Sequence, residues 1–190
     1  MITTTATATT SCSAGRRATD FAAVTAAWAV VVAAAAVFPV EDPPVSRLAL
    51  FIHLMSMTIG FGAVVMIDAY GILCLFGRRT LSEVVDVGKA AHGLIAAGIG
   101  GLLGSGIALH PDLTSPLARL KLVLVLVLML NGVAAQRMLH RLQEALPADV
   151  RGANIPWAVF QRVLFVGLVS QASWWGAIAI GFLTNANRTS

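Results

Sequence analysis

The stretch "RLALFIHLMSMTIGFGAVVMIDAYGILCLFGRR", residues 47–79, constrains the fold more than any other part of the sequence. Between its flanking arginines it holds only one acidic residue, Asp68, and one histidine, His53. An apolar run of about 20 residues is long enough to cross the hydrocarbon core of a bilayer as a helix. Only 12% of the residues are charged and the mean hydropathy is +0.82, whereas a soluble domain carries roughly 25% charged residues. The sequence therefore predicts an integral membrane protein.

Five apolar segments divide the chain, and we expect each to form a transmembrane helix in an all-α membrane bundle. They span residues 21–40, 48–77, 88–110, 117–138 and 157–183. Residues 1–20 are rich in Thr, Ala and Ser and predict a disordered cytoplasmic tail, and residues 185–190 an outer tail. The first segment is longer than the apolar core of a signal peptide and lacks a small-residue cleavage site. We therefore expect it to be retained as the first helix of a transmembrane domain over residues 21–184.

The basic residues predict the orientation of the helices and argue against a nucleic-acid partner. Cytoplasmic loops of membrane proteins carry an excess of Lys and Arg, and the two predicted sides carry eight and three such residues. This asymmetry predicts an inner N-terminus and an outer C-terminus. The net charge of +4 resides mostly at segment ends rather than in one soluble patch, so the bilayer is the expected partner. The eight are Arg16, Arg17, Arg78, Arg79, Lys89, Arg137, Arg141 and Arg151, and the three are Arg47, Arg119 and Arg188.

Ionisable residues inside membrane helices are costly and usually functional, and here they predict two polar layers. Counted from the outer helix ends at about 1.5 Å per residue, His53 and Lys121 lie about 8 and 6 Å deep and predict an outer layer. His92, Asp68 and Arg162 lie about 26, 30 and 31 Å deep and predict an inner layer. Asp68 has three interpretations, and one of them is that the inner-layer side chains reach the membrane surface. The other two assign it a partner. It joins two helices by pairing with Arg162, or it handles protons together with His92.

The same depths restrict how haem could be bound. His53 and His92 are separated by about 18 Å along the membrane normal, so they cannot both ligate one haem iron. A site built on His53, with His110 or Lys121 beside it, satisfies the depths. The two cysteines show no metal-binding spacing, and no nucleophile–base pair, P-loop or zinc motif occurs. We expect neither a metal site of that kind nor an enzymatic activity.

Small residues recur at four-residue spacing on the segment 88–110. Such rows let a second helix, or a flat ring, approach the backbone closely. We interpret them first as helix packing, with His92 on the row as the feature that favours a cofactor. The residues concerned are Gly93, Ala96, Gly100, Gly101 and Gly104.

Three apolar motifs resemble a family of uncharacterised bacterial polytopic membrane proteins. They are "IHLMSMTIGFGAVVMID", "GSGIAL" and "LKLVLVLVLMLNG", and the resemblance covers residues 48–138. This skeleton is also loosely similar to the copper-resistance CopD-type domain and to the HemJ-type protoporphyrinogen oxidases. The resemblance implies a bacterial plasma membrane, haem or porphyrin as the ligand class, and His53 and Lys121 as the residues of interest.

Three functional hypotheses follow from the sequence. The first is a haem-binding or redox-associated protein, with His53 as ligand and Lys121 meeting a propionate or acting as second ligand. The second is a small proton-coupled transporter component that uses Asp68, His92 and Arg162. The third is an accessory subunit whose small-residue helix docks onto other membrane subunits or onto a second copy of the chain.

Overall fold

The protein is an all-helical bundle with five helices long and apolar enough to cross a membrane, as the sequence predicts. The computed structural model describes residues 5–37, 43–109, 112–147 and 149–186, and no strand occurs among them. Its elements are α1 (Thr5–Val37), α2 (Pro43–Leu75), α3 (Leu81–Ala108), α4 (Pro116–Ala145), a 3₁₀ turn η1 (Gly152–Asn154) and α5 (Trp157–Ala186).

Several helices extend further than their predicted apolar segments. Helix α2 begins at Pro43 and α3 at Leu81, five and seven residues before the predicted starts at 48 and 88. Helix α1 begins at Thr5, within the segment for which the sequence predicts a tail, although only Ala18–Val37 is apolar enough to span a membrane. Helix α4 continues to Ala145, beyond the predicted end at residue 138. High hydropathy identifies the part of a helix that contacts lipid. A helix can extend beyond that part into water through polar residues, as long as no turn-forming residue ends it. The last four residues of the predicted outer tail fall outside the described residues.

Helices α2 and α3 form an antiparallel hairpin whose turn is specified by local sequence. Gly77 ends α2 with a φ of 72°, the left-handed conformation that glycine adopts without strain. Arg78 N donates to Leu73 O and Gly77 N to Cys74 O, which is the Schellman pattern. Thr80 then caps α3 in a capping box with Glu83.

The two helices of this hairpin approach most closely where glycine meets glycine. A Cβ placed on Gly98 would lie 2.6 Å from the Cα of Gly60 and 2.8 Å from the backbone oxygen of Ser56. Buried small residues recur every seven positions on both helices, which is the repeat of a left-handed helix pair. They are Ala49, Ser56 and Ala63 on α2, and Ala91, Gly98 and Ser105 on α3.

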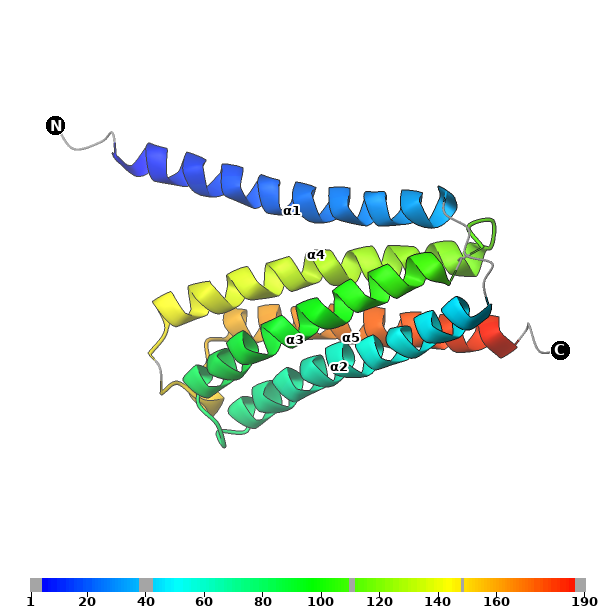
Figure 1. Ribbon diagram of the computed structural model, residues 1–190. Coiled ribbons are helices and arrows are strands. Elements are labelled where there is room, and N and C mark those ends of the chain that lie inside the picture. The colour runs from blue at the N-terminus through cyan, green and yellow to red at the C-terminus, as the bar shows by residue number, and fades with distance from the viewer. Residues whose placement is uncertain (1–4, 38–42, 110–111, 148, 187–190) are drawn as a thin grey trace.

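Helices α4 and α5 form a second hairpin, and α1 lies at the edge of the bundle against α3 and α4 (Figure 1). Trp174 of α5 is 2% exposed and forms the core with Val64 of α2 and Leu128 of α4. Phe61 packs against the Trp174 ring at a centroid distance of 5.6 Å. Helix α1 is held more loosely. Its Trp28 Nε1 donates to Leu122 O at 3.1 Å.

The two hairpins also meet at the end of the bundle where the arginines collect. The connection from α4 to α5 reaches back to the α2–α3 turn, where Leu81 N donates to Val150 O at 2.9 Å. Gly152 packs beside Gly77, since a Cβ placed on Gly152 would lie 3.5 Å from the Gly77 Cα. We call this the arginine-rich end, defined by residues 76–80 and 146–157.

Candidate functional site

The candidate site lies toward the end of the bundle opposite the arginine-rich end, where His53 of α2 meets Ser105 of α3. His53 Nδ1 is 3.0 Å from Ser105 Oγ. The Ser105 hydroxyl lies 2.5 Å from the carbonyl oxygen of Gly101, one helical turn earlier. Ser105 is buried and His53 is partly buried. The histidine that the sequence singles out therefore has a defined polar partner on the neighbouring helix.

This arrangement specifies which imidazole nitrogen carries the proton. A serine hydroxyl has one hydrogen to donate, and the short distance assigns that hydrogen to Gly101 O. Ser105 Oγ must then accept from His53, so in the neutral ring Nδ1 is the protonated nitrogen and Nε2 keeps its lone pair. The assignment rests on the hydrogen-bond network. In this tautomer Nε2 is the nitrogen that could accept a proton or ligate a metal.

Lys121 of α4 lies within electrostatic range of the same imidazole. Its Nζ lies 3.7 Å from the position of a Cβ on Gly181 of α5. In the described part of the chain, no carboxylate forms an ion pair with Lys121. A partly buried ammonium with no acidic partner favours an anionic group from outside the chain, because an unpaired charge in a low-dielectric site is costly.

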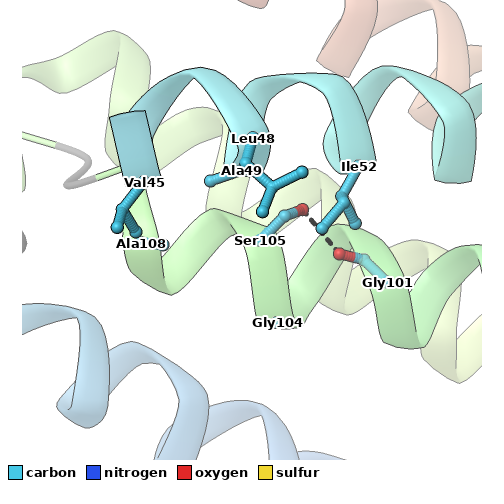
Figure 2. Close-up of a pocket in the computed structure, with 8 residues that line it drawn as sticks. All are labelled: Val45, Leu48, Ala49, Ile52, Gly101, Gly104, Ser105 and Ala108. Atoms are coloured by element: carbon cyan, nitrogen blue, oxygen red, sulfur yellow. Dashed lines mark hydrogen bonds between the residues drawn. The ribbon is translucent and has the colours of Figure 1, made fainter. Parts of the chain in front are cut away.

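A shallow apolar groove adjoins this polar cluster between α2 and α3 (Figure 2). Its volume is about 360 Å³. Ser105 lines both the groove and the contact with His53, and the wall that α3 contributes is made of small residues. The lining residues are Val45, Leu48, Ala49, Ile52, Gly101, Gly104, Ser105 and Ala108.

Asp68, the acidic residue of the predicted inner layer, is bound by a neutral side chain. Gln171 Nε2 of α5 donates to Asp68 Oδ2 at 2.5 Å. Trp175 Nε1, one turn further along α5, donates to Gln171 Oε1 at 3.1 Å. The three side chains thus form a chain of donors that ends on the carboxylate. Gln171 and Trp175 are four positions apart and so lie on one face of α5, and this spacing of hydrogen-bonding side chains is the sequence signal for such a chain.

The structure does not bring Arg162 or His92 to Asp68. Within the described residues no ion pair joins Asp68 to Arg162, and both Arg162 and His92 are exposed. Arg162 precedes Gln171 by nine residues, about 13 Å of helical rise. The sequence-based depths of Asp68, Arg162 and His92 are each counted from the end of their own helix. Such counting assumes that all helix ends lie in one plane, and helices in a bundle need not satisfy that assumption. The pairing of Asp68 with Arg162 is therefore replaced by the pairing with Gln171.

The small residues of α3 divide between two environments. Gly101 packs against Ser56 of α2, and it is the member of the predicted row that lies in a helix contact. A Cβ added to Gly93, Gly100 or Gly104 would have no atom within 4 Å, and Ala96 is exposed. The closest approach uses Gly98 and Gly60, which the four-residue count misses. The seven-residue recurrence of small residues on both helices is the signal that finds them.

Two further polar side chains bear on the site and the core. His110, the alternative second ligand, falls outside the described residues. Trp174 Nε1 is buried in the core without a hydrogen-bond partner. No group of three or more His, Cys, Asp or Glu able to hold a metal ion occurs in the part of the chain that the structure describes.

A comparison with protein-family models, curated proteins and solved structures finds no match to the chain.

Proposed function

We propose that His53, Ser105 and Lys121 form a ligand site in the membrane and that haem b is the ligand. The proposal rests on the hydrogen bonds that fix the His53 tautomer and leave Nε2 with its lone pair. Imidazole nitrogen is a common protein ligand of haem iron. Metal-ligating histidines are typically oriented by a hydrogen bond from the other ring nitrogen, and Ser105 occupies that position.

The charges of the cluster match the remaining chemistry of haem. A haem carries carboxylate groups, and Lys121 provides an ammonium that has no acidic partner among the described residues. When bound, haem would supply one-electron redox chemistry. In this scheme His53 holds the group, Ser105 orients the imidazole and Lys121 pairs with a carboxylate or serves as second ligand.

Titration of the haem-free protein in detergent with haem tests this assignment residue by residue. We expect the Ser105→Ala variant to bind haem about 10-fold more weakly, the usual consequence of removing a residue that orients a ligating histidine. Lys121→Met should weaken binding as well, and His53→Ala should abolish the ligated spectrum. The exposed His140→Ala variant is the matched control and should bind normally. Equal binding by all four variants would refute the proposed site.

A second candidate function is supported by the pairing of Asp68. A carboxylate held by a neutral amide, without a cation, can change its protonation state without breaking an ion pair. A proton-coupled transporter component would use Asp68 in this way, with Gln171 and Trp175 as its partners. Loss of transport in a correctly folded Asp68→Asn variant would support this function, and full retention would exclude it.

The exposed face of α3 supports an assembly with other membrane subunits or with a second copy of the chain. Gly93, Gly100 and Gly104 leave open space beside the helix, and small residues of this kind let two helices approach closely. Purification in mild detergent tests this role, because a stable partner or a dimer would be retained and a monomer would argue against it.

We propose a bacterial plasma membrane as the location, with the arginine-rich end in the cytoplasm. The support is the excess of Lys and Arg in the connections at that end, which is the positive-inside pattern. Arg78, Arg79 and Arg151 are exposed there.

A further inference from the structure

A cavity at the arginine-rich end lies where the two hairpins meet. It has a volume of about 730 Å³. One wall is the end of α2 at Leu75, and the others are the η1 turn and the first turn of α5. The lining residues are Leu75, Gly152, Asn154, Ile155, Pro156, Trp157 and Phe160. This cavity is separate from the cluster of His53 and Lys121, which lies toward the other end of α2.

Two arginines flank the cavity without an acidic partner. Arg151 directly precedes the lining residue Gly152, and Arg78 directly follows Gly77, which packs against Gly152. Both side chains are exposed, and neither forms an ion pair in the described part of the chain. Arg79 already pairs with Glu83 at 2.7 Å. Asp149 is the only acidic residue in residues 146–157, so the arginine-rich end carries an excess of positive charge beside the cavity.

Aromatic and apolar side chains continue from the cavity along α5. The rings of Trp157 and Phe160 stack at a centroid distance of 5.0 Å, and Trp157 is 67% exposed. Tryptophan at the end of a membrane helix marks the level of the lipid headgroups. Phe165 and Leu168 extend the exposed apolar surface toward the membrane centre. Arg78 and Arg151 lie in the connections next to the start of α5. Along α5 the exposed Trp157 is followed by the exposed apolar Phe165 and Leu168, with the exposed polar Gln161 and Arg162 between them. A cation, an amphipathic ring and apolar groups also follow one another in this order along a phospholipid.

We propose that this cavity binds the headgroup of an anionic phospholipid, with Arg78 and Arg151 contacting the phosphate and the acyl chains lying on the exposed face of α5. Guanidinium groups suit phosphate because their planar donors match its oxygens. The bound lipid contacts residues of both hairpins, so it stabilises their junction.

Thermal unfolding of the full-length protein in detergent, with and without added lipid, tests the proposal. We expect phosphatidylglycerol to raise the melting temperature, whereas zwitterionic phosphatidylcholine and free inorganic phosphate should not. One arginine at a membrane surface contributes about 1 kcal/mol toward anionic lipid, which is about a five-fold change in affinity. Arg78→Gln with Arg151→Gln should therefore weaken the apparent affinity for phosphatidylglycerol about 20-fold.

A matched double variant separates this site from general attraction to charged lipid. Arg47→Gln with Arg119→Gln removes the same charge at the opposite end and should change the affinity less than two-fold. Arg78→Lys with Arg151→Lys keeps the charge but loses the planar donors, so it should bind more tightly than the glutamine variant and more weakly than the unaltered protein. It also controls for misfolding of the glutamine variant. Equal losses in the two glutamine variants would overturn the proposal. So would equal stabilisation by phosphatidylcholine, or stabilisation that follows dimer formation instead of lipid concentration.

Discussion

At the scale of single residues, Gly98 is the glycine at which a side chain would come closest to the backbone of another helix. An added Cβ would meet backbone atoms of Gly60 and Ser56 at 2.6–2.8 Å, and backbone cannot move aside as a flexible side chain can. We expect Gly98→Ala to destabilise the protein by about 1–3 kcal/mol, the usual cost of overpacking. A lower apparent melting temperature in detergent measures this effect.

Gly100 on the same helix provides the control for this substitution. It has open space around it, and alanine is favoured over glycine in a helix by up to about 1 kcal/mol. Gly100→Ala should therefore leave the melting temperature unchanged or raise it. If Gly98→Ala behaves in the same way, the close approach of α2 and α3 is incorrect.

The hydrogen bond between Asp68 and Gln171 gives a second prediction at this scale. Interhelical hydrogen bonds in membrane proteins contribute about 0.6 kcal/mol on average and about 1.7 kcal/mol at most. A double-mutant cycle with Asp68→Ala and Gln171→Ala should give a coupling energy in that range, measured by unfolding in mixed micelles. A second cycle, with Asp68→Ala and Arg162→Ala, should give no coupling energy. A larger coupling energy for Asp68 with Arg162 than for Asp68 with Gln171 would support the ion pair expected from the sequence.

The sequence was enough to identify the ionisable residues inside the membrane helices as candidates, but it was not enough to identify their partners on other helices. Counting helical rise brings His53 and Lys121 to one level, and Lys121 lies within electrostatic range of His53 in the structure. The same counting assigns Asp68 to Arg162, because it assumes a common plane for all helix ends. A partner on another helix depends on tilt and register, which packing determines and the apolar pattern of one helix does not contain.

At the scale of elements, α1 is the helix most weakly attached to the bundle. Its contacts among the described residues are chiefly with α3 and α4, and most of its described side chains are exposed. We predict that a protease cut introduced between Val37 and Pro43 releases α1 from the purified protein in detergent. The hydrogen bond of Trp28 contributes only about 1 kcal/mol and the exposed ion pair of Asp20 with Arg137 about 1 kcal/mol at most, which together are too little to retain α1.

A second cut, introduced in the connection between α3 and α4, is the control. The two hairpins share the core of Val64, Leu128 and Trp174 and the Asp68–Gln171 hydrogen bond, so the pieces should co-elute. Release of the hairpins with retention of α1 would contradict the arrangement of the bundle.

The helices themselves were predictable because a membrane span needs a long apolar run, whereas their packing repeat was not. The apolar runs locate all five helices that are long enough to span. Small residues on α3 occur at both four- and seven-residue spacing. The sequence of α3 alone does not show which of the two spacings packs against α2. The matching recurrence of Ala49, Ser56 and Ala63 on α2 identifies the seven-residue repeat.

At the scale of the whole molecule, five spans would place the two termini on opposite sides of the membrane. If the arginine-rich end is in the cytoplasm, as we propose from its excess of Lys and Arg, alkaline phosphatase fused after Ser190 should be active in bacterial cells, and green fluorescent protein fused there should be dark. Fusions after Gly152 should give the opposite pattern. Identical results for the two fusion points would contradict the five-span arrangement.

The central claim is that His53 and its partners bind haem, and an absorption spectrum tests it most directly. The protein would be purified in mild detergent from haem-replete cells and measured as isolated and after reduction with dithionite. We predict a Soret band and a reduced α-band in the unaltered protein and in the exposed-histidine variant His92→Ala, and neither band in His53→Ala. A flat spectrum of the unaltered protein, or bands that persist in His53→Ala, would contradict the claim.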